Sequence, residues 1–229
     1  MSETRFPAYV VRKAGDGTIR TAVETVSVDD LPAGDVLIRV VCSSLNYKDA
    51  LAATGNPGVA RRLPHVPGID CAGRVESDQS GRFAEGERVL VTGYGLGTEA
   101  WGGYSQYVRV PVDWVVPLPD GLSFDEAMSY GTAGFTAAQA VGAIAGRGID
   151  RERGEIVVTG ATGGVGSFSV ALLARAGYRV AAVTDKPEAH DYLRRLGAAR
   201  LLQRDEVRDT SDRTLLKAQW SSAVDTVGG

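Results

Sequence analysis

The segment Gly154-Glu155-Ile156-Val157-Val158-Thr159-Gly160-Ala161-Thr162-Gly163-Gly164-Val165-Gly166 decides the fold of this chain. Its β-branched first half predicts a short buried strand, and a glycine-rich turn follows at once. An apolar helical pattern then runs from Val165 to Ala176. A strand, a glycine turn and a helix in direct succession are typical of the unit that binds the pyrophosphate of a dinucleotide.

Three small residues in this segment have the spacing of the dinucleotide fingerprint, with Ala161 at the first glycine position and Gly163 and Gly166 at the other two. The first allows a tight turn, the second lets the backbone approach a pyrophosphate, and the third lets the helix pack on the strand. Unbonded N–H groups and the helix dipole favour anions at the helix N-terminus. The alternative is a glycine turn with a structural role only. The residues expected to bind the cofactor phosphates are Ala161, Thr162, Gly163, Gly164, Val165 and Gly166.

Composition narrows the class of protein. The chain has 229 residues, of which 44% are hydrophobic, and a formal net charge of −3, so it can form one large or two modest domains and shows no sign of a nucleic-acid partner. No apolar run is long enough to span a membrane, so we expect no membrane partner. Cys42 and Cys71 stand in apolar surroundings and are expected to be buried free thiols and not a disulfide, which fits a cytoplasmic location. His65 and His190 are expected to be ordinary surface or loop histidines, and no Cys-rich zinc site can be built.

The chain is predicted to form two domains, residues 1–122 and residues 123–229. The first is rich in turns and predicts a small antiparallel barrel or sandwich, with strands at Val36–Val41, Ala72–Glu76, Arg88–Thr92 and Tyr104–Val110. Ser123 and Glu126 form a capping box that opens a helical region from Glu126 to Ala145, interrupted near Gly131 to Gly134.

The second domain alternates strands and helices, which predicts a parallel sheet. Its expected helices are Gly164–Ala176, one that begins at Pro187 and ends at Leu196, and a brief one ending near Trp220; its expected strands are Ile156–Thr159, Arg179–Thr184, Arg200–Gln203 and Ala223–Val227. A complete dinucleotide domain has about six strands. We therefore expect the chain to be a C-terminally incomplete piece, in which Val224–Val227 is the innermost strand of the second half-sheet.

Four segments together carry a resemblance to a known family: Ser43-Ser44-Leu45-Asn46-Tyr47-Lys48-Asp49-Ala50, Pro67-Gly68-Ile69-Asp70-Cys71-Ala72-Gly73, Gly131-Thr132-Ala133-Gly134-Phe135-Thr136-Ala137 and Thr159-Gly160-Ala161-Thr162-Gly163-Gly164-Val165-Gly166-Ser167. The chain resembles the zinc-independent medium-chain dehydrogenases/reductases, in the branch of acrylyl-CoA reductases and quinone oxidoreductases. The resemblance implies an α/β fold class: a GroES-like β-barrel substrate domain and a partial Rossmann domain, a doubly wound parallel sheet. It also implies NADP(H) as cofactor and a homodimer in the full-length protein.

The resemblance places three residues where the family's alcohol dehydrogenases hold a catalytic zinc, namely Asn46, Ile69 and Asp70. Isoleucine cannot ligate a metal and asparagine is a poor zinc ligand, so we expect no metal. Hydride addition to an activated C=C bond or to a quinone needs no Lewis acid, because conjugation spreads the developing charge. Alcohol oxidation is disfavoured because no metal would be present to polarise the carbonyl group.

The resemblance also assigns candidate roles near the reacting atoms. Tyr47 would donate the proton or hold the enolate oxygen, and otherwise is a half-buried phenol satisfied locally. Asn46 would hydrogen-bond substrate or nicotinamide, and otherwise caps a helix start. Asp70 is expected to be a structural acceptor for backbone or for Lys48. Thr132 would lie against the nicotinamide, with close helix packing as the alternative.

Cofactor choice depends on the end of the second strand of the second domain. An NAD site usually has Asp or Glu there, and this chain has Thr184, followed by Asp185 and Lys186, with Arg179 expected nearby. A hydroxyl group and a cation suit a 2′-phosphate, so NADP(H) is favoured. The alternative for Lys186 is a solvated charge at a helix start.

These features predict a zinc-free, NADPH-dependent reductase of activated alkenes, with a short enoyl-CoA such as acrylyl-CoA as substrate. A quinone reductase is the alternative within the same class. A nucleotide-binding protein without catalysis, or an inactive fragment, is the alternative of another class.

Overall fold

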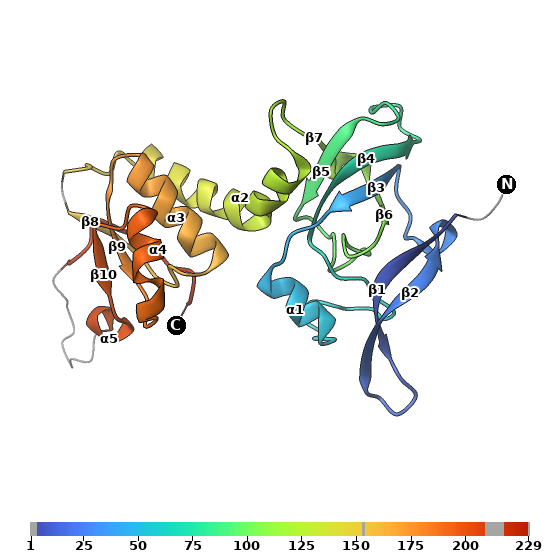
Figure 1. Cartoon of the computed structure of the whole chain (residues 1–229), viewed down its shortest axis with the longest axis horizontal. Helices are drawn as coiled ribbons and strands as arrows, with labels where there is room; N and C mark the ends of the chain where they lie inside the picture. The colour runs from blue at the N-terminus through green and yellow to red at the C-terminus, as the bar shows by residue number, and fades with distance from the viewer. Residues whose placement is uncertain (1–3, 153, 209–217, 229) are drawn as a thin grey trace. The chain divides into compact units, whose positions relative to one another are not determined.

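The computed structural model describes residues 4–152, 154–208 and 218–228 (Figure 1). It divides into two compact units, Met1–Thr132 and Ala133–Gly229. This division lies inside helix α2 (Phe124–Gly146). The boundary expected at residues 122 and 123 stays a prediction.

The first unit is antiparallel, as expected from its short strands and frequent turns. A five-stranded sheet has the order β6-β3-β4-β5-β7, and β1 and β2 form a separate two-stranded hairpin. The bounds are β1 (Arg5–Lys13), β2 (Ile19–Ser27), β3 (Val36–Cys42), β4 (Asp70–Asp78), β5 (Arg88–Thr92), β6 (Tyr107–Val110) and β7 (Val116–Pro117), with a short helix α1 (Tyr47–Ala53) and the 3-10 turns η1 (Val28–Asp30) and η2 (Val112–Trp114).

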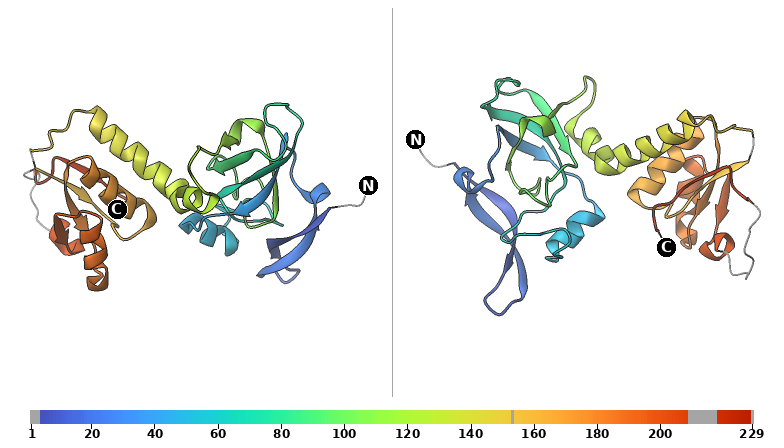
Figure 2. Two further views of the ribbon diagram at one scale, coloured as in Figure 1. Left: turned by 45° about the horizontal axis from the view of Figure 1, so that its top comes forward. Right: turned by 180° about the vertical axis from the view of Figure 1, so that it is seen from behind.

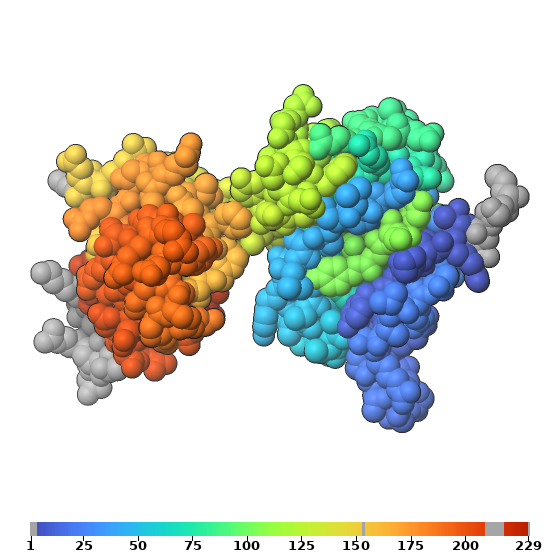
Figure 3. All heavy atoms as spheres, viewed as in Figure 1, coloured from blue at the N-terminus to red at the C-terminus, as the bar shows by residue number. Residues whose placement is uncertain are grey.

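The hairpin of β1 and β2 was not expected from the sequence. Most residues of β2 are exposed or half-buried, so the strand lacks the apolar run that would reveal it. In the space-filling view the hairpin forms its own projection from the first unit (Figure 3). It is joined to the remainder of the unit by backbone hydrogen bonds between Val11 and His65 in both directions, at 2.7 and 2.9 Å.

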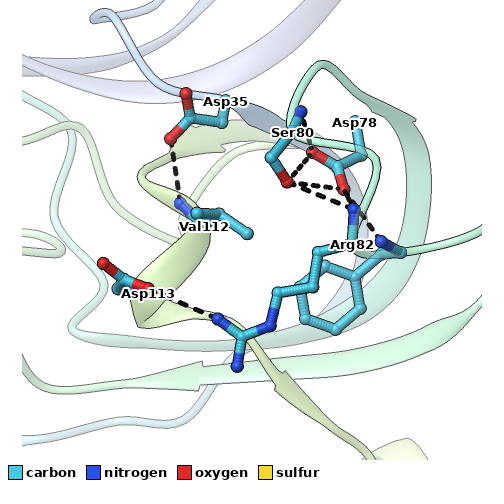
Figure 4. Close-up of polar contacts among 7 residues, drawn as sticks. Asp35, Asp78, Ser80, Arg82, Val112 and Asp113 are labelled. Carbon is cyan, nitrogen blue, oxygen red and sulfur yellow. Dashed lines mark hydrogen bonds and ion pairs between the residues drawn. The ribbon is translucent and has the colours of Figure 1, made fainter.

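The turn after β4 shows how single carboxylates shape the first unit (Figure 4). The carboxylate of Asp78 accepts hydrogen bonds from the backbone N–H groups of Ser80, Arg82 and Phe83, each at 2.8 Å. The Arg82 guanidinium lies 3.3 Å from Asp113, and Asp35 accepts from the N–H of Val112 at 3.1 Å. The bonds to Asp78 close the turn, and the contacts of Asp113 and Asp35 join neighbouring segments of the unit.

Helix α2 begins at the capping box predicted from the sequence. The Ser123 hydroxyl accepts from the N–H of Glu126 at 3.1 Å, and the Glu126 carboxylate accepts from the N–H of Ser123 at 2.8 Å. The predicted interruption is also confirmed, because Gly131 has φ 47° and ψ −153°, which breaks the helical path. A positive φ of this kind favours glycine.

The second unit is a four-stranded parallel sheet of order β10-β9-β8-β11, which in chain order is 3-2-1-4, as in a doubly wound dinucleotide fold. The bounds are β8 (Glu155–Val158), α3 (Gly164–Arg175), β9 (Arg179–Val183), the 3-10 turn η3 (Pro187–Ala189), α4 (His190–Arg195), β10 (Arg200–Leu202), α5 (Arg204–Val207) and β11 (Ser222–Val224). The predicted position of the last strand beside the first is confirmed by the pairing of β11 with β8. The expected extent of this strand to Val227 is wrong, because β11 ends at Val224.

Both faces of this sheet are covered, as a parallel sheet requires. Ile156 and Val158 of β8 pack in one core with residues of α2, α3 and α4, and Val157 between them packs in another with Val207 and Trp220. Figure 2 shows α3 and α4 on the same side of the sheet. The brief helix expected before Trp220 falls mainly on residues 209–217, outside the described residues. No helix in the described residues is both long and apolar enough to cross a membrane.

Candidate active site

One buried carboxylate organises the polar centre of the first unit. Asp70, at the start of β4, is fully buried. It accepts hydrogen bonds from the Ser44 hydroxyl, from the Asn46 amide Nδ2 at 2.8 Å, and from the Thr132 hydroxyl at 2.6 Å. The N–H of Thr132 adds contacts of 3.1 and 3.0 Å to its two oxygens. Several donors thus replace the water that the carboxylate loses on burial.

This cluster fixes the orientation of Asn46. A carboxylate can only accept, so the amide nitrogen of Asn46 must be the atom that faces Asp70. The same nitrogen donates to the Ser44 hydroxyl oxygen at 2.8 Å. Both of its N–H bonds are therefore committed. Asn46 is also the N-cap of α1, in a capping box with Asp49, so Oδ1 is the one group of this side chain that can accept a hydrogen bond from a ligand, and it does so beside the helix start.

A second buried carboxylate holds the two segments that supply this cluster. Asp49 of α1 is 1% exposed and accepts from the N–H groups of Asn46 at 2.8 Å, Gly68 at 3.1 Å and Ile69 at 2.9 Å. The sequence pattern assigned no role to Asp49. Its place in the first turn of α1 lets it bond the residue before the helix and also the strand entry that leads to Asp70.

The residues at the expected zinc-ligand positions do not make a metal site. Ile69 is a buried hydrocarbon, Asn46 presents its N–H groups, and both oxygens of Asp70 already accept hydrogen bonds. No group of three or more His, Cys, Asp or Glu side chains is placed to hold a metal within the described part of the chain. The donor set therefore does not fit zinc.

Asn46 and Thr132 are brought together at Asp70, whereas Tyr47 lies apart from them. Tyr47 is 81% exposed and begins α1. Asp70 is a structural acceptor for backbone, as expected, because the N–H of Thr132 donates to it. Lys48, the other expected donor, is exposed, and the remaining donors to Asp70 are neutral side chains.

A tyrosine that the sequence did not single out, Tyr104, contacts the same cluster. Its hydroxyl donates to the backbone carbonyl of Ser44 at 3.2 Å, and burial, with Asp49 nearby, raises the pKa of this phenol. With Tyr9 and Leu45 it lines an apolar cavity of about 270 Å³ beside α1. Tyr104 follows Gly102 and Gly103 at the start of a predicted strand. Its contact with the segment of Ser44 is visible only in the folded structure.

The cysteines are free, as predicted, and Cys71 is fully buried while Cys42 is partly exposed. Burial raises the pKa of Cys42 to about 11 and that of Cys71 to about 12, with Asp125 and Asp70 as further causes respectively. Neither thiol is therefore a nucleophile at neutral pH. His65 lies in a loop, as one of the two expected alternatives had it, but not at the surface: this side chain is 2% exposed, and its Nε2 lies 2.8 Å from the carbonyl oxygen of Gly97.

In the second unit, the glycine turn leads directly into the N-terminus of α3. Gly163 is the N-cap residue of α3, and its N–H donates to the Gly160 carbonyl at 2.9 Å. A Cβ on Gly166 would overlap that same carbonyl and would lie 2.8 Å from Cα of Ala161. A side chain at Gly166 would thus push the helix off the strand. The N–H groups of the first turn of α3 have no partner within the helix, which suits an anion.

The end of β9 holds the other expected cofactor residues. Thr184 is 5% exposed, and its hydroxyl oxygen accepts from the N–H of Lys186 at 3.1 Å. The Lys186 side chain is exposed. The expectation that Arg179 lies nearby is wrong, because Arg179 begins β9 at the opposite end of the strand and lies 3.6 Å from Glu155.

Arg204 is a cation at this edge that the sequence pattern did not identify. The side-chain Nε of Arg204 lies 3.1 Å from the Asp185 carboxylate, and the backbone N–H of Arg204 donates to the same carboxylate at 2.9 Å. With Arg208 it lines a cavity of about 430 Å³ that also reaches Thr159, Gly160, Val183, Val207, Asp225, Val227 and Gly228. A basic residue after the third strand is a weak signal, and the parallel sheet is what brings it beside the end of the second strand.

Comparison with known proteins identifies relatives over the whole chain. Residues 32–120 match the alcohol dehydrogenase GroES-like domain, and residues 156–222 match the NAD-dependent epimerase/dehydratase family. Acrylyl-CoA reductase AcuI of Ruegeria pomeroyi is 48% identical over 225 residues, which are 98% of this chain and 68% of the relative. YhfP of Bacillus subtilis, provisionally named a quinone oxidoreductase, is 48% identical over 226 residues, 99% of this chain and 68% of the relative.

Solved structures agree with this result. The yhdH oxidoreductase of Salmonella enterica in complex with NADP matches with a TM-score of 0.92 and 49% identity, over 97% of this chain and 68% of that one. Bacillus subtilis yhfP with NAD bound gives a TM-score of 0.92 and 48% identity, over 98% and 68%. The predicted GroES-like domain and parallel-sheet nucleotide domain are confirmed. The chain belongs to the medium-chain dehydrogenase/reductase family, in the branch of the acrylyl-CoA reductases and quinone oxidoreductases.

Proposed function

We propose that this chain provides the substrate and cofactor sites of a zinc-independent, NADPH-dependent reductase of activated C=C bonds, acting on a short enoyl-CoA such as acrylyl-CoA. The observation that carries the proposal is the Asp70 cluster. Two of the residues at the zinc-ligand positions, Asn46 and Asp70, are bonded to each other here, and Ser44 and Thr132 also donate to the Asp70 carboxylate. A conjugated thioester needs no metal to accept a hydride, because its own carbonyl takes up the charge.

The bound nicotinamide cofactor would supply the hydride. In the first unit, Asn46 offers its Oδ1 as an acceptor, which suits an N–H donor such as a carboxamide. The network around Asp70 keeps this amide from rotating, since a flipped amide would set two acceptor oxygens against each other. Thr132 supports the same carboxylate and is proposed to lie at the cofactor.

Tyr47 is proposed to donate the proton at the α-carbon or to hold the thioester oxygen. Its phenol is solvent-exposed, so it can be reprotonated after each turnover. A tyrosine hydroxyl carries a proton that it can donate in such a step. The thiols of Cys42 and Cys71 are unsuited to either task because their pKa values are raised to about 11 and about 12.

The second unit is proposed to hold the dinucleotide. The cradle at Ala161–Gly166 would bind the pyrophosphate, and Thr184, Lys186 and Arg204 would meet the ribose of the adenosine half. Asp185, which could read an unmodified 2′-hydroxyl, is already paired with Arg204. A hydroxyl group and two cations favour a 2′-phosphate, and hence NADPH over NADH.

The alternative within this class is an NADPH:quinone oxidoreductase, which the name of the YhfP relative favours. The apolar cavity of Tyr9, Leu45 and Tyr104 could receive a quinone ring as well as an acyl group. Turnover of NADPH with acrylyl-CoA and with 1,4-benzoquinone separates the two. A higher kcat/KM with the thioester supports the proposal, and turnover of the quinone alone supports the alternative.

A further inference from the structure

An exposed aromatic stack adjoins an arginine-lined cavity in the first unit. The proposed reaction uses neither of them. Tyr94 has φ 52°, a backbone conformation that a bulky residue rarely adopts. Its side chain is 68% exposed and stacks on Trp114, with ring centroids 5.6 Å apart and an interplanar angle of 7°. Trp114 packs against the buried core of the sheet, so the stack has a fixed base and an outer ring face open to solvent.

The cavity adjoins the loop that carries Tyr94, because Thr98 and Glu99 of that loop form one of its walls. It measures about 290 Å³ and is lined by Arg61, Arg62, Thr98 and Glu99. The Arg61 guanidinium lies 3.1 Å from the Glu99 carboxylate, which holds it in place. Among the described residues, Arg62 has no ion-pair partner, so two guanidinium groups face one carboxylate and the cavity favours an anion.

Gly95 connects the two features. A Cβ built on Gly95 would lie 2.9 Å from the Trp114 ring and 3.4 Å from the Glu99 carboxylate, so the aromatic stack and the ion pair are immediate neighbours. The loop is also tied to the strand entry that leads to Asp70, because the N–H of Gly93 donates to the carbonyl of Ile69 at 3.1 Å. The patch therefore belongs to the same rigid part of the first unit as the Asp70 cluster.

A flat aromatic face beside paired guanidinium groups has the chemistry that recognises a phosphorylated adenosine. Bases stack on aromatic side chains, and arginine binds phosphate oxygens through its planar fork. We propose that this patch binds the 3′-phosphoadenosine diphosphate end of a CoA thioester, with the adenine on Tyr94 and the phosphates at Arg61 and Arg62. The inference rests on the proposed function, and it sets CoA thioesters apart from quinones and from simple enals as substrates.

The kinetic test compares acrylyl-CoA with the acrylyl thioester of pantetheine, which lacks the nucleotide. Arg62→Ala is expected to raise KM for acrylyl-CoA about fivefold, the size of effect expected for an exposed charge pair. Tyr94→Ala is expected to raise KM for acrylyl-CoA about tenfold. Tyr94→Phe keeps an aromatic ring and the same positive φ at this position, and is expected to leave KM unchanged. KM for the pantetheine thioester stays constant in all three variants. Arg39→Ala is the control, since Arg39 is an exposed arginine paired with Glu76 on the sheet.

A binding test separates this inference from the proposed reaction. The probe is 3′-phosphoadenosine 5′-phosphate, titrated in the presence of saturating NADPH so that the cofactor site is occupied. Binding that Arg62→Ala and Tyr94→Ala weaken supports the patch even if acrylyl-CoA is not turned over, in which case only the proposed reaction is wrong. Equal binding of the probe by wild type and both variants overturns the inference, as does an equal rise in KM for both thioesters.

Discussion

Asp70 and Gly131 constrain each other at the centre of the first unit. A Cβ on Gly131 would lie 2.8 Å from Oδ2 of Asp70 and 3.2 Å from Oγ of Ser44, and the residue has φ 47°. The kink of α2 therefore serves to bring the N–H of Thr132 to the carboxylate.

Gly131→Ala should lower the free energy of unfolding by about 1–3 kcal/mol, the cost of a strained backbone conformation, before any loss from the displaced carboxylate is added. Urea unfolding measures this change. Gly142→Ala is the matched control, because Gly142 lies in the same helix with nothing within 4 Å of its Cβ position. The control should be neutral or stabilise by up to about 1 kcal/mol. Equal effects of the two substitutions would contradict the role given to Gly131.

Tyr47→Phe tests the proposed proton donor. Removing one hydroxyl should lower kcat roughly ten- to a thousandfold, in line with general-acid contributions, and leave NADPH affinity almost unchanged. Stopped-flow single turnover reports the chemical step directly. Tyr104→Phe is the comparison, because its hydroxyl is occupied by the Ser44 carbonyl. If Tyr47→Phe reacts like wild type and Tyr104→Phe does not, the donor is misassigned.

Cofactor choice is tested by Lys186→Ala and Arg204→Ala. Each should weaken NADPH binding by about 1.5 kcal/mol, the lower end for hydrogen bonds to charged groups, since both side chains are largely exposed. NADH binding should change little. Arg179→Ala serves as control because Arg179 lies at the other end of β9. Equal losses for NADPH and NADH would show that these residues support the fold and do not read the phosphate.

Among the elements, those with a strong local signal were predicted well and those without one were missed. The capping box at Ser123 and the alternation of strand and helix after Glu155 each depend on neighbouring residues, so the sequence reveals them. The β1–β2 hairpin depends on cross-strand pairing of half-exposed residues. Pro187 begins a 3-10 turn before α4, and the helix proper starts only at His190.

His65 links three elements and gives the first unit a pH dependence. Its backbone bonds Val11 of β1, and its ring contacts Gly97 in the loop after β5. Burial lowers the pKa of His65 in the folded state. The unfolded chain therefore binds the proton more readily, and the stabilisation is present above pH ~6.5 and is lost as the pH falls through the lower, folded pKa.

The stability of wild type should accordingly decline as the pH is lowered from about 7 to 5. His65→Gln, whose amide can donate to the Gly97 carbonyl without titrating, should show a flatter profile over this range. Thermal unfolding at closely spaced pH values checks this. Parallel profiles for wild type and His65→Gln would exclude His65 as the cause.

At the scale of the whole molecule, the order of motifs was enough to predict both folds and the family. The site was only partly predictable. Asn46, Asp70 and Thr132 came from motif positions, but their mutual contacts required the kink at Gly131. Arg204 could not be found, because the sequence separates it from Asp185 by 19 positions and only the parallel sheet joins them. The division at Thr132 and Ala133 falls directly after the kink at Gly131 inside α2, and no shift in composition marks it.

In the proposed reductase, the Asp70 cluster, the glycine turn at Ala161–Gly166 and the end of β9 all serve one reaction. The most direct measurement is NADPH consumption with acrylyl-CoA, with propionyl-CoA identified as the product and a metal chelator present throughout. The account predicts turnover that the chelator does not affect and that exceeds the rate with 1,4-benzoquinone. Turnover abolished by the chelator, or confined to the quinone, would contradict it.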